Sequence, residues 1–397
     1  MLPNLDHDRQ ILSLMVSGRF DAAGWESFSY ADWGRLIDKA RMEGVAPLLY
    51  WAFSRSANFS SLAQDVQNSL RASYAYTWMQ NQKNFKVLET LSHLFAQQDI
   101  LVVLLKGACY ALTIYSDIGL RPMGDLDILV PAQKSSDAIQ IVKSLGYTDW
   151  MPDAPEIFSG QQVFLNHEVC LQKPKYAPIE IHRSLMVENT FTYSVPMDWF
   201  WEQTEPLGAV SQMHFEKLLV LTPVAQMLHA AVHSMLQHGG SDTPLRWYYD
   251  LDQMVRYYQN RLDWDVLLFQ AGKFEWGSAL EAALSYTLAC FDTPIPNDVR
   301  SRFSNHSDRH RKLVALKQVQ PSTLILGEHQ QLLSMNWHGR FRLVLALIFP
   351  SPAYMRWRYK FQSIWVLPWY CLVRWAGILR DGIDTVLVLI RGAIKPA

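Results

Sequence analysis

Two acidic side chains stand at the start of an apolar run, in the segment DLDILV of residues 125–130. Asp125 and Asp127 are two residues apart, so a strand places them on one face and its apolar residues on the other. Like charges this close repel, and taking either from water is costly unless a cation or hydrogen bonds compensate. The pair therefore either binds a cation or, as is common for two spaced acids, caps a turn and stays solvated.

A third carboxylate lies in PIEIHRS, residues 178–184, where Glu180 and His182 share one face of an expected strand. If this strand neighbours the first, the three carboxylates converge. Such hard oxygen ligands suit Mg²⁺ or Mn²⁺. A pair of these ions about 3.5 to 4 Å apart can activate an attacking oxygen and stabilise nucleotide phosphates. His182 is either a hydrogen-bond partner behind these acids or an ordinary buried histidine.

Lys106 and Gly107 occur where the short β-branched run ILVVLL gives way to the helix-like ACYALTIY. Backbone N–H groups at a helix start bind phosphate, and glycine permits close approach. A lysine beside the positive end of a helix is unfavourable unless an anion lies between them. The alternative is an exposed surface lysine.

Arg121, in the loop before Asp125, is either a phosphate clamp or an ion-pair partner that orients an aspartate.

Two histidines, His229 and His233, are four residues apart on an expected helix, the spacing at which two imidazoles can share a metal. No glutamate of an HExxH motif accompanies them, and packing at a helix interface is the commoner role. Asp250, in LRWYYDLD, is a possible partner. Binding of an acceptor substrate by this pair of helices is a third interpretation.

The elements that must position these residues follow a simple order. Apolar spacings of three and four predict helices over the first ~95 residues, and helical spacing returns from Phe215. Short β-branched runs lie between, including HEVCLQK and APIEIHRSL joined by a turn at 174–177. We therefore predict an α+β fold with a small mixed sheet at 96–210, between helical regions at 1–95 and 211–397.

The charge, the cysteines and the apolar runs of the chain bear on its partners and its location in the cell. The chain has 36 Lys and Arg against 37 Asp and Glu, so no basic field favours nucleic acid as a partner. Its four widely separated cysteines contain no CxxC pair, which favours a reducing cytoplasm. The terminus MLPNLDHDRQ does not resemble an export signal. The uncharged runs at 343–355 and 361–373 are too short for a membrane span, and each contains proline.

The C-terminal segment 340–397 is basic and aromatic. It holds nine Lys or Arg against two Asp, together with four tryptophans. Such a segment can seat a helix on an anionic membrane surface, here the inner face of the cytoplasmic membrane. The alternative is that the aromatic side chains pack on the protein while the basic groups reach solvent.

Four stretches together resemble a known family: LLKGACYALTIY, RPMGDLDILV, the following helix that ends in LGY, and IEIHRSL. They resemble the DNA polymerase beta-type nucleotidyltransferase superfamily, and more closely the uncharacterised nucleotidyltransferase family of bacteria. The resemblance is specific over residues 100–185 and looser in the helical flanks. It implies that Asp125, Asp127 and Glu180 bind catalytic metal and that Lys106 and Gly107 hold nucleotide phosphates.

The resemblance implies a Mg²⁺-dependent transferase that moves a nucleoside monophosphate from a nucleoside triphosphate such as ATP to an unidentified small molecule, sugar, peptide or protein. LKG replaces the superfamily's glycine-serine pair, so Lys106 either assists phosphate binding or marks a different donor. The competing hypothesis is a non-catalytic nucleotide-binding or membrane-surface regulatory protein with the same fold. Replacing Asp127 with Asn is expected to abolish transfer and leave the fold intact.

Overall fold

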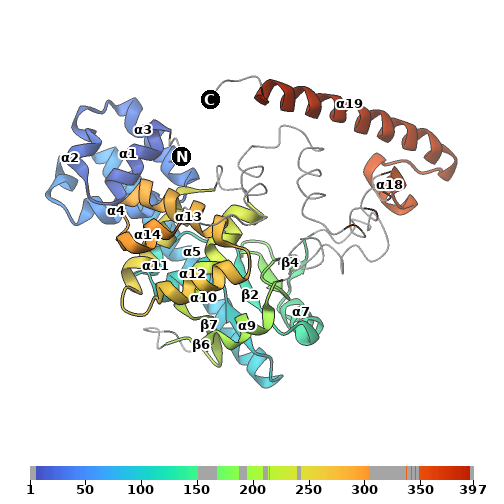
Figure 1. The fold of residues 1–397 in the computed structure, drawn as a ribbon, viewed down its shortest axis with the longest axis horizontal. Helices are drawn as coiled ribbons and strands as arrows, with labels where there is room; N and C mark the ends of the chain where they lie inside the picture. The colour runs from blue at the N-terminus through green and yellow to red at the C-terminus, as the bar shows by residue number, and fades with distance from the viewer. Residues whose placement is uncertain are drawn as a thin grey trace.

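The computed structural model describes most of the chain and places it around one mixed sheet (Figure 1). The described residues are 6–150, 168–186, 195–208, 213, 215–238, 243–303, 337, 341, 345 and 348–393, with side chains described as far as residue 380. The predicted α+β class, with a small mixed sheet between helical regions, is confirmed.

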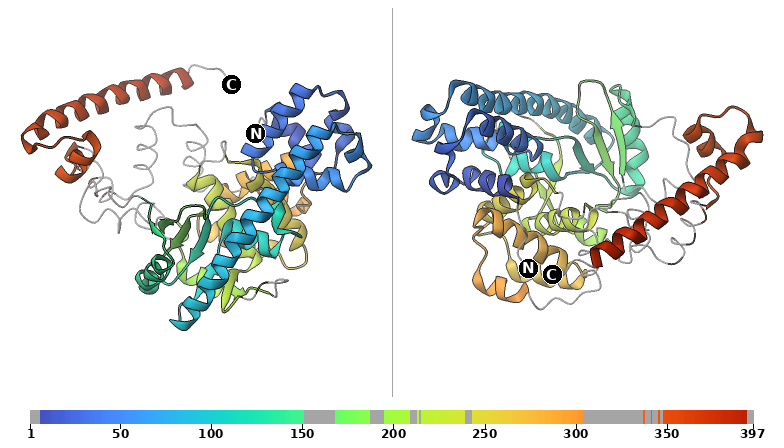
Figure 2. Two further views of the ribbon diagram at one scale, coloured as in Figure 1. Left: turned by 180° about the vertical axis from the view of Figure 1, so that it is seen from behind. Right: turned by 90° about the horizontal axis from the view of Figure 1, so that it is seen from above.

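The N-terminal region is helical, as predicted. Its helices are α1 (His7–Val16), α2 (Phe20–Ala23), α3 (Tyr30–Met42), α4 (Ala46–Ser54) and α5 (Gln64–Gln97), with 3-10 helices at Trp25–Ser27 and Ala57–Ser61. Ser29 and Asp32 form a capping box at the start of α3, which satisfies backbone N–H groups there. The long helix α5 crosses the molecule (Figure 2, left), so it links the helical bundle to the sheet region.

The sheet contains seven described strands in the order β3-β4-β5-β2-β1-β7-β6. Their bounds are β1 Val102–Leu104, β2 Leu126–Leu129, β3 Thr148–Asp149, β4 Glu168–Gln172, β5 Ile179–His182, β6 Thr204–Pro206 and β7 Leu218–Leu221. β2 is parallel to β5 and antiparallel to β1, while β1 is parallel to β7. β4 and β5 form the predicted hairpin. The two acidic segments therefore lie on neighbouring strands near the middle of the sheet.

Helices in the middle of the chain cover this sheet. α6 (Lys106–Thr113) contacts β2, α7 (Ser135–Ser144) contacts β4 and β5, and α10 (Pro223–Val232) contacts β7. The central strands β1 and β2 are buried along their whole length, as expected for strands covered on both faces. Short 3-10 helices at Ile118–Leu120 and Ala132–Lys134 flank β2.

The region from Phe215 begins with a strand, where the sequence had predicted only helix. β7 pairs with β1, and the helix starts one residue after Thr222, at Pro223. A short apolar run such as KLLVL fits a buried strand and a helix turn equally well, and only its partner strand decides between them. β7 also lies beyond residue 210, which was the predicted border of the sheet region.

The remaining helices lie before and after β7. They are α9 (Met197–Glu202) before it and, after α10, a π-helix at His233–Gln237, then α11 (Leu245–Tyr257), α12 (Trp264–Lys273), α13 (Gly277–Phe291) and α14 (Asn297–Phe303). α13 contacts α1, so the C-terminal helices lie against the N-terminal bundle (Figure 1). Buried side chains from all three predicted regions form one hydrophobic core. The division of the chain at 95 and 210 stays a prediction.

Two helices at the C-terminus pack on each other beside this body (Figure 2). They are α18 (Pro352–Tyr359) and α19 (Leu367–Ala393), joined by a 3-10 helix at Ile364–Val366. Phe361 stacks on Tyr370 at 5.1 Å between ring centroids. Within the described residues, no helix has the length and apolar character that a membrane crossing requires.

Candidate active site

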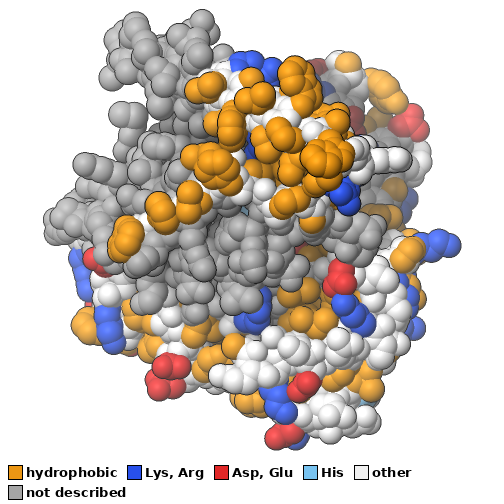
Figure 3. All heavy atoms as spheres, turned by 90° about the vertical axis from the view of Figure 1, so that its right-hand side faces the viewer, with side chains coloured by type: hydrophobic (Ala, Val, Ile, Leu, Met, Phe, Trp, Pro, Cys, Tyr) orange, Lys and Arg blue, Asp and Glu red, His pale blue; other side chains and the backbone are white. Residues whose placement is uncertain are grey.

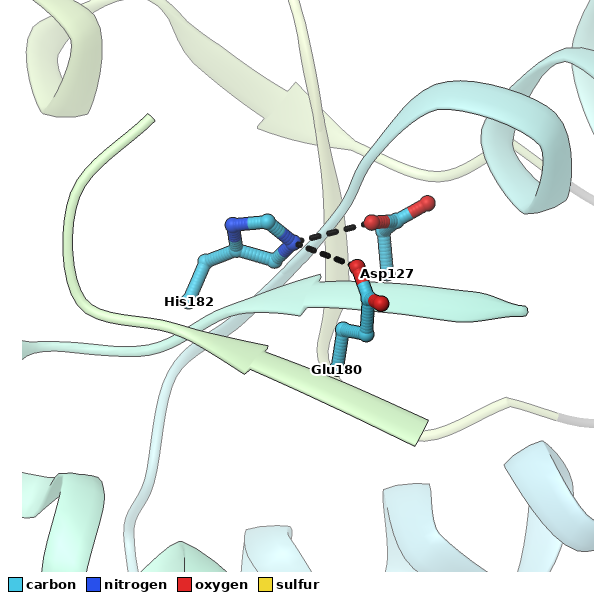
Figure 4. Close-up of side chains that lie close together, drawn as sticks. All are labelled: Asp127, Glu180 and His182. Carbon is cyan, nitrogen blue, oxygen red and sulfur yellow. Dashed lines mark hydrogen bonds and ion pairs between the residues drawn. The ribbon is translucent and has the colours of Figure 1, made fainter. Parts of the chain in front are cut away.

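Two of the three predicted acids face each other across neighbouring strands. Asp127 on β2 is paired in register with Glu180 on β5, and both point toward His182 of β5 (Figure 4). The alternation of apolar and polar residues fixes this direction, because the residues on either side of both acids are buried. Asp125 lies two residues before Asp127 and directly before the first residue of β2.

Asp127 is fully buried and is held by two side chains of its own protein. Its Oδ1 accepts a hydrogen bond from Lys106 Nζ at 2.8 Å and lies 2.8 Å from His182 Nε2. Although burial alone would raise the pKa of Asp127, Lys106 and His182 hold it well below its usual range. Asp127 is therefore an ionised carboxylate in a fixed orientation, and its cation is Lys106 rather than Arg121, the ion-pair partner that the sequence suggested for an aspartate.

Lys106 reaches Asp127 because of an unusual backbone conformation. Its φ of 46° lies in the left-handed region, which a non-glycine residue rarely adopts. This turn joins β1 to α6. Leu105 N–H donates to Asp127 O at 3.1 Å, and this hydrogen bond holds the turn against β2. Burial lowers the pKa of Lys106 and Asp127 raises it, with a net rise. Lys106 is thus a mostly buried, paired cation rather than the exposed surface lysine of the alternative interpretation.

Two other acids of the site, Glu180 and Asp125, ionise less readily than isolated carboxyl groups. Burial and the neighbouring carboxylates Asp127, Glu168 and Asp125 raise the pKa of Glu180 to about 9. Burial and Asp127 raise the pKa of Asp125 to about 6. Four carboxylates thus surround one lysine, and Glu180 and Asp125 resist ionisation beside the other two.

His182 lies beneath this cluster, where no solvent reaches its side chain. Burial and the nearby Lys106 lower its pKa, so the ring is neutral. Because the ionised Asp127 can only accept, the Nε2–H of His182 donates to it. Its Nδ1 lies 3.3 Å from Glu168 Oε2. His182 therefore orients Asp127 from behind.

The donor set fits a divalent cation. Potential ligand atoms of Asp127, Glu180 and His182 lie within 4.8 Å of one another. Within the described residues, no other His, Cys, Asp or Glu side chains form such a group of three. The surplus of carboxylate charge is what a bound Mg²⁺ or Mn²⁺ would relieve. His182 already donates to Asp127, so oxygen atoms of Asp125, Asp127 and Glu180 suit the ion better.

A second buried ion pair joins the sheet region to the C-terminal helices. Arg121 Nε and Nη2 donate to the two carboxylate oxygens of Asp250 at 2.7 and 2.6 Å, and Tyr115 Oη donates to the same group at 2.7 Å. Asp250 lies on α11, and both charged side chains are at most 5% exposed. Arg121 therefore pairs with an aspartate 129 residues away rather than with Asp125 or Asp127.

A cavity of about 200 Å³ brings most of the predicted residues together. Its lining includes Lys106, Gly107, Arg121, Asp125, Asp127, Glu180, His233 and Asp250. A Cβ atom on Gly107 would lie 3.2 Å from Met123 Cγ and 3.3 Å from Arg121 Nη1, so a side chain there would crowd this wall. The N-cap residue of α6, Leu105, makes no side-chain hydrogen bond to the helix start, and the first two residues of that helix, Lys106 and Gly107, line the cavity.

The two histidines, His229 on α10 and His233 at the start of the following π-helix, have different surroundings. His229 is buried away from the cavity lining, whereas His233 lines the cavity and packs on Trp247 at 4.8 Å between ring centroids. Burial and nearby Lys106 put the pKa of His233 well below its ordinary value. The pair forms no group of three potential metal ligands within the described residues. This arrangement matches the packing interpretation, and a role in acceptor binding stays a prediction.

Two charged residues of the cavity had not been singled out from the sequence. Glu168 sits on β4 opposite His182, and its alternation with Cys170 in EVCLQ could have indicated a polar face beside Glu180. Arg246 stands four residues before Asp250 on α11, one helical turn away. No local pattern marks Arg246, because the fold alone brings α11 to the sheet.

Comparison with known proteins identifies the family. The family model described as uncharacterised nucleotidyltransferase matches residues 29–292, which is more than half of the chain. Among solved structures, the chain is similar to an antigenic nucleotidyltransferase-like protein from Paracoccidioides brasiliensis, with 14% identity, 51% of this chain and 93% of that chain covered, and a TM-score of 0.29. No curated protein matches. The predicted family is thereby confirmed, and the chain belongs to the uncharacterised nucleotidyltransferases.

Proposed function

We propose that this protein is a metal-dependent nucleotidyltransferase that moves a nucleoside monophosphate from a nucleoside triphosphate, such as ATP, to an acceptor hydroxyl. One observation carries the proposal. Carboxylates from two neighbouring strands, Asp127 and Glu180, line the same cavity as Asp125 and the uncapped helix start at Gly107. Acids for a cation and N–H groups for a phosphate thus face one space.

The residues have separable roles in this reaction. Asp125, Asp127 and Glu180 would hold Mg²⁺ or Mn²⁺, which neutralises phosphate charge and favours attack on phosphorus. Lys106 and His182 keep Asp127 ionised and oriented. The backbone at Gly107 binds phosphate oxygens. The acceptor oxygen bonds to the α-phosphorus as its proton passes to Glu180, and the bond to the leaving pyrophosphate breaks with its electron pair on the pyrophosphate.

The size of the cavity limits how the nucleotide is held. About 200 Å³ is below the ~300–1,000 Å³ of pockets that enclose a whole drug-sized ligand. The cavity therefore encloses the triphosphate and leaves the base and the acceptor near its mouth. Recognition of the base and of the acceptor depends on residues around that mouth.

Replacing Glu180 with Gln tests the metal-dependent reaction. Protein and a cell lysate are incubated with labelled ATP, GTP, CTP and UTP in turn, and labelled acceptor and pyrophosphate are measured. We expect wild-type protein to label an acceptor with one nucleotide in the presence of Mg²⁺, and Glu180→Gln to lose transfer by about 10³-fold, because several kcal/mol of charge stabilisation are lost.

Glu89→Gln on α5, outside the described lining of the cavity, is a matched control and should retain transfer. Equal rates in wild-type protein and Glu180→Gln would contradict the catalytic assignment. Binding of Mg-ATP by wild-type protein without any transfer, with the lysate present, would favour a non-catalytic nucleotide-binding protein.

A membrane surface is a second candidate partner, which the exposed C-terminal side chains favour. Trp365 is 88% exposed, Leu379 69% and Trp369 65%. Figure 3 shows hydrophobic side chains gathered on one face of the molecule, with Lys and Arg side chains beside them. Aromatic and basic side chains together suit the interface of an anionic bilayer.

Flotation with vesicles that contain phosphatidylserine tests this contact. We expect wild-type protein to float with the vesicles, and the double variant Trp365→Ser, Trp369→Ser to lose most of this binding. Trp150→Ser, at a position 50% exposed elsewhere on the chain, should float like wild type. Equal flotation of the wild type and the double variant would exclude these tryptophans as the anchor.

A further inference from the structure

Arg246 differs from the other cations of the cavity in having no partner among the described residues. Lys106 pairs with Asp127, and Arg121 pairs with Asp250. Arg246 lines the same cavity, yet it has no hydrogen bond or ion pair from its guanidinium in the described part of the chain, and its Nε is buried. A buried donor without an acceptor is costly, so this cation is available to an incoming anion.

The charge of Arg246 is permanent under ordinary conditions. Burial and the neighbouring Arg121 lower its pKa, but a guanidinium stays protonated at neutral pH. Asp250 and Asp125 act on it electrostatically, and neither forms an ion pair with it among the described residues. The cavity therefore keeps one positive charge that its own carboxylates do not neutralise by contact.

The N-terminal bundle fixes the position of Arg246. Leu245 N–H donates to Glu43 Oε2 at 2.7 Å, and Arg246 N–H donates to Glu43 O at 3.1 Å. Glu43 is itself held by Arg9, whose Nε donates to Glu43 Oε1 at 2.8 Å. Glu43 thus accepts the hydrogen bonds of two backbone N–H groups at the start of α11. An anion in the cavity would meet the side chain of Arg246 rather than these N–H groups.

Gly44 makes room for the arginine side chain. Its φ of +70° is a conformation that glycine adopts readily, and a Cβ atom there would lie 2.4 Å from Arg246 Cδ. Any other residue at position 44 would displace Arg246 or strain the turn. The turn between α3 and α4 therefore has the shape that lets this arginine extend into the cavity.

We propose that Arg246 binds the β- and γ-phosphates of the nucleotide, which leave together as pyrophosphate. This inference rests on the proposed function. As the acceptor oxygen bonds to the α-phosphorus, the bond to the bridging oxygen breaks and its electrons remain on the pyrophosphate. A planar guanidinium matches phosphate oxygens in pairs. Lys106 and Arg121 are already paired with aspartates, so among the described Lys and Arg residues of the lining Arg246 is the one left to neutralise this leaving group.

Calorimetry with inorganic pyrophosphate and Mg²⁺ tests the inference. Arg246→Gln should weaken pyrophosphate binding by roughly 10- to 100-fold, the effect of losing a hydrogen-bonded charge. Arg246→Lys, which keeps the charge but lacks the fork, should give an intermediate loss. Binding of a nucleoside monophosphate should change by less than about threefold, because that ligand lacks the leaving group.

Two further variants complete the design. Gly44→Ala leaves the arginine in the chain but displaces it, so pyrophosphate binding should weaken as in Arg246→Gln. Arg261→Gln alters an exposed arginine paired with Glu205 and should bind like wild type. Circular dichroism confirms that each variant is folded before its binding is measured.

The outcomes separate this inference from the proposed function. Equal pyrophosphate affinity in wild type and Arg246→Gln, or equal losses for pyrophosphate and monophosphate, would overturn the role of Arg246 whatever the transfer assay shows. If pyrophosphate binding depends on Arg246 but wild-type protein transfers no nucleotide, the anion site stands and the proposed reaction fails.

Discussion

Asp125→Asn should abolish nucleotide transfer without lowering the free energy of unfolding. Asp125 forms no hydrogen bond or ion pair within the described residues, and burial together with Asp127 raises its pKa to about 6. A carboxylate with a raised pKa is less stable ionised in the folded protein than in the unfolded chain, so at neutral pH its charge opposes folding. Removing that charge leaves stability unchanged or higher, while about 10³-fold of rate is lost if Asp125 is a metal ligand as proposed.

Asp127→Asn should abolish transfer as well, but at a large cost in stability. Lys106 is mostly buried against Asp127, and its ammonium group would lose the carboxylate that it contacts at 2.8 Å. Breaking such a pair by removing one partner costs about 3–5 kcal/mol. The structure thus argues against the expectation, drawn from the sequence, that this variant leaves the fold intact.

Urea unfolding and pyrophosphate release, measured on the same samples, distinguish the two variants. The double variant Lys106→Met, Asp127→Asn should recover part of the lost stability and none of the activity, because it removes both buried charges. An Asp125→Asn protein with wild-type turnover would remove Asp125 from the catalytic site. Equal stability of Asp127→Asn and wild type would contradict the buried pair.

Asp250→Asn should lower the melting temperature by about 10 °C. The change removes the charge that compensates the buried guanidinium of Arg121, and it disturbs the hydrogen bond from Tyr115. Loss of one partner from a buried pair costs about 3–5 kcal/mol, and 1 kcal/mol shifts the melting temperature by roughly 2–4 °C in domains of 150–250 residues.

Calorimetry of two further variants, one single and one double, tests why stability is lost. Glu205→Gln breaks an exposed pair with Arg261 and should shift the melting temperature by no more than about 2 °C. Replacing both partners with apolar residues, Arg121→Met and Asp250→Leu, should restore most of the stability lost in Asp250→Asn. A melting temperature for Asp250→Asn within the range of Glu205→Gln would show that this pair contributes little.

The sequence by itself determined the acidic strand faces and the helical surroundings. Alternation in DLDILV and PIEIHRS is a local property of the backbone, so it places Asp127 and Glu180 on polar faces before any partner strand is known. Helical spacing is equally local, which is why α5 and α11 were expected. The short run at β7 was not, because a few apolar residues fit both periods and the choice depends on β1.

Only the tertiary structure decided which charges meet. Lys106 contacts Asp127 across 21 residues of chain, and Arg121 contacts Asp250 across 129. No sequence pattern encodes such partners, because they depend on how strands and helices pack and on how far each side chain reaches. The tertiary structure also decided the place of Arg246 in the cavity. The start of α11 and the turn at Gly44 are distant in the sequence and meet only in the folded protein.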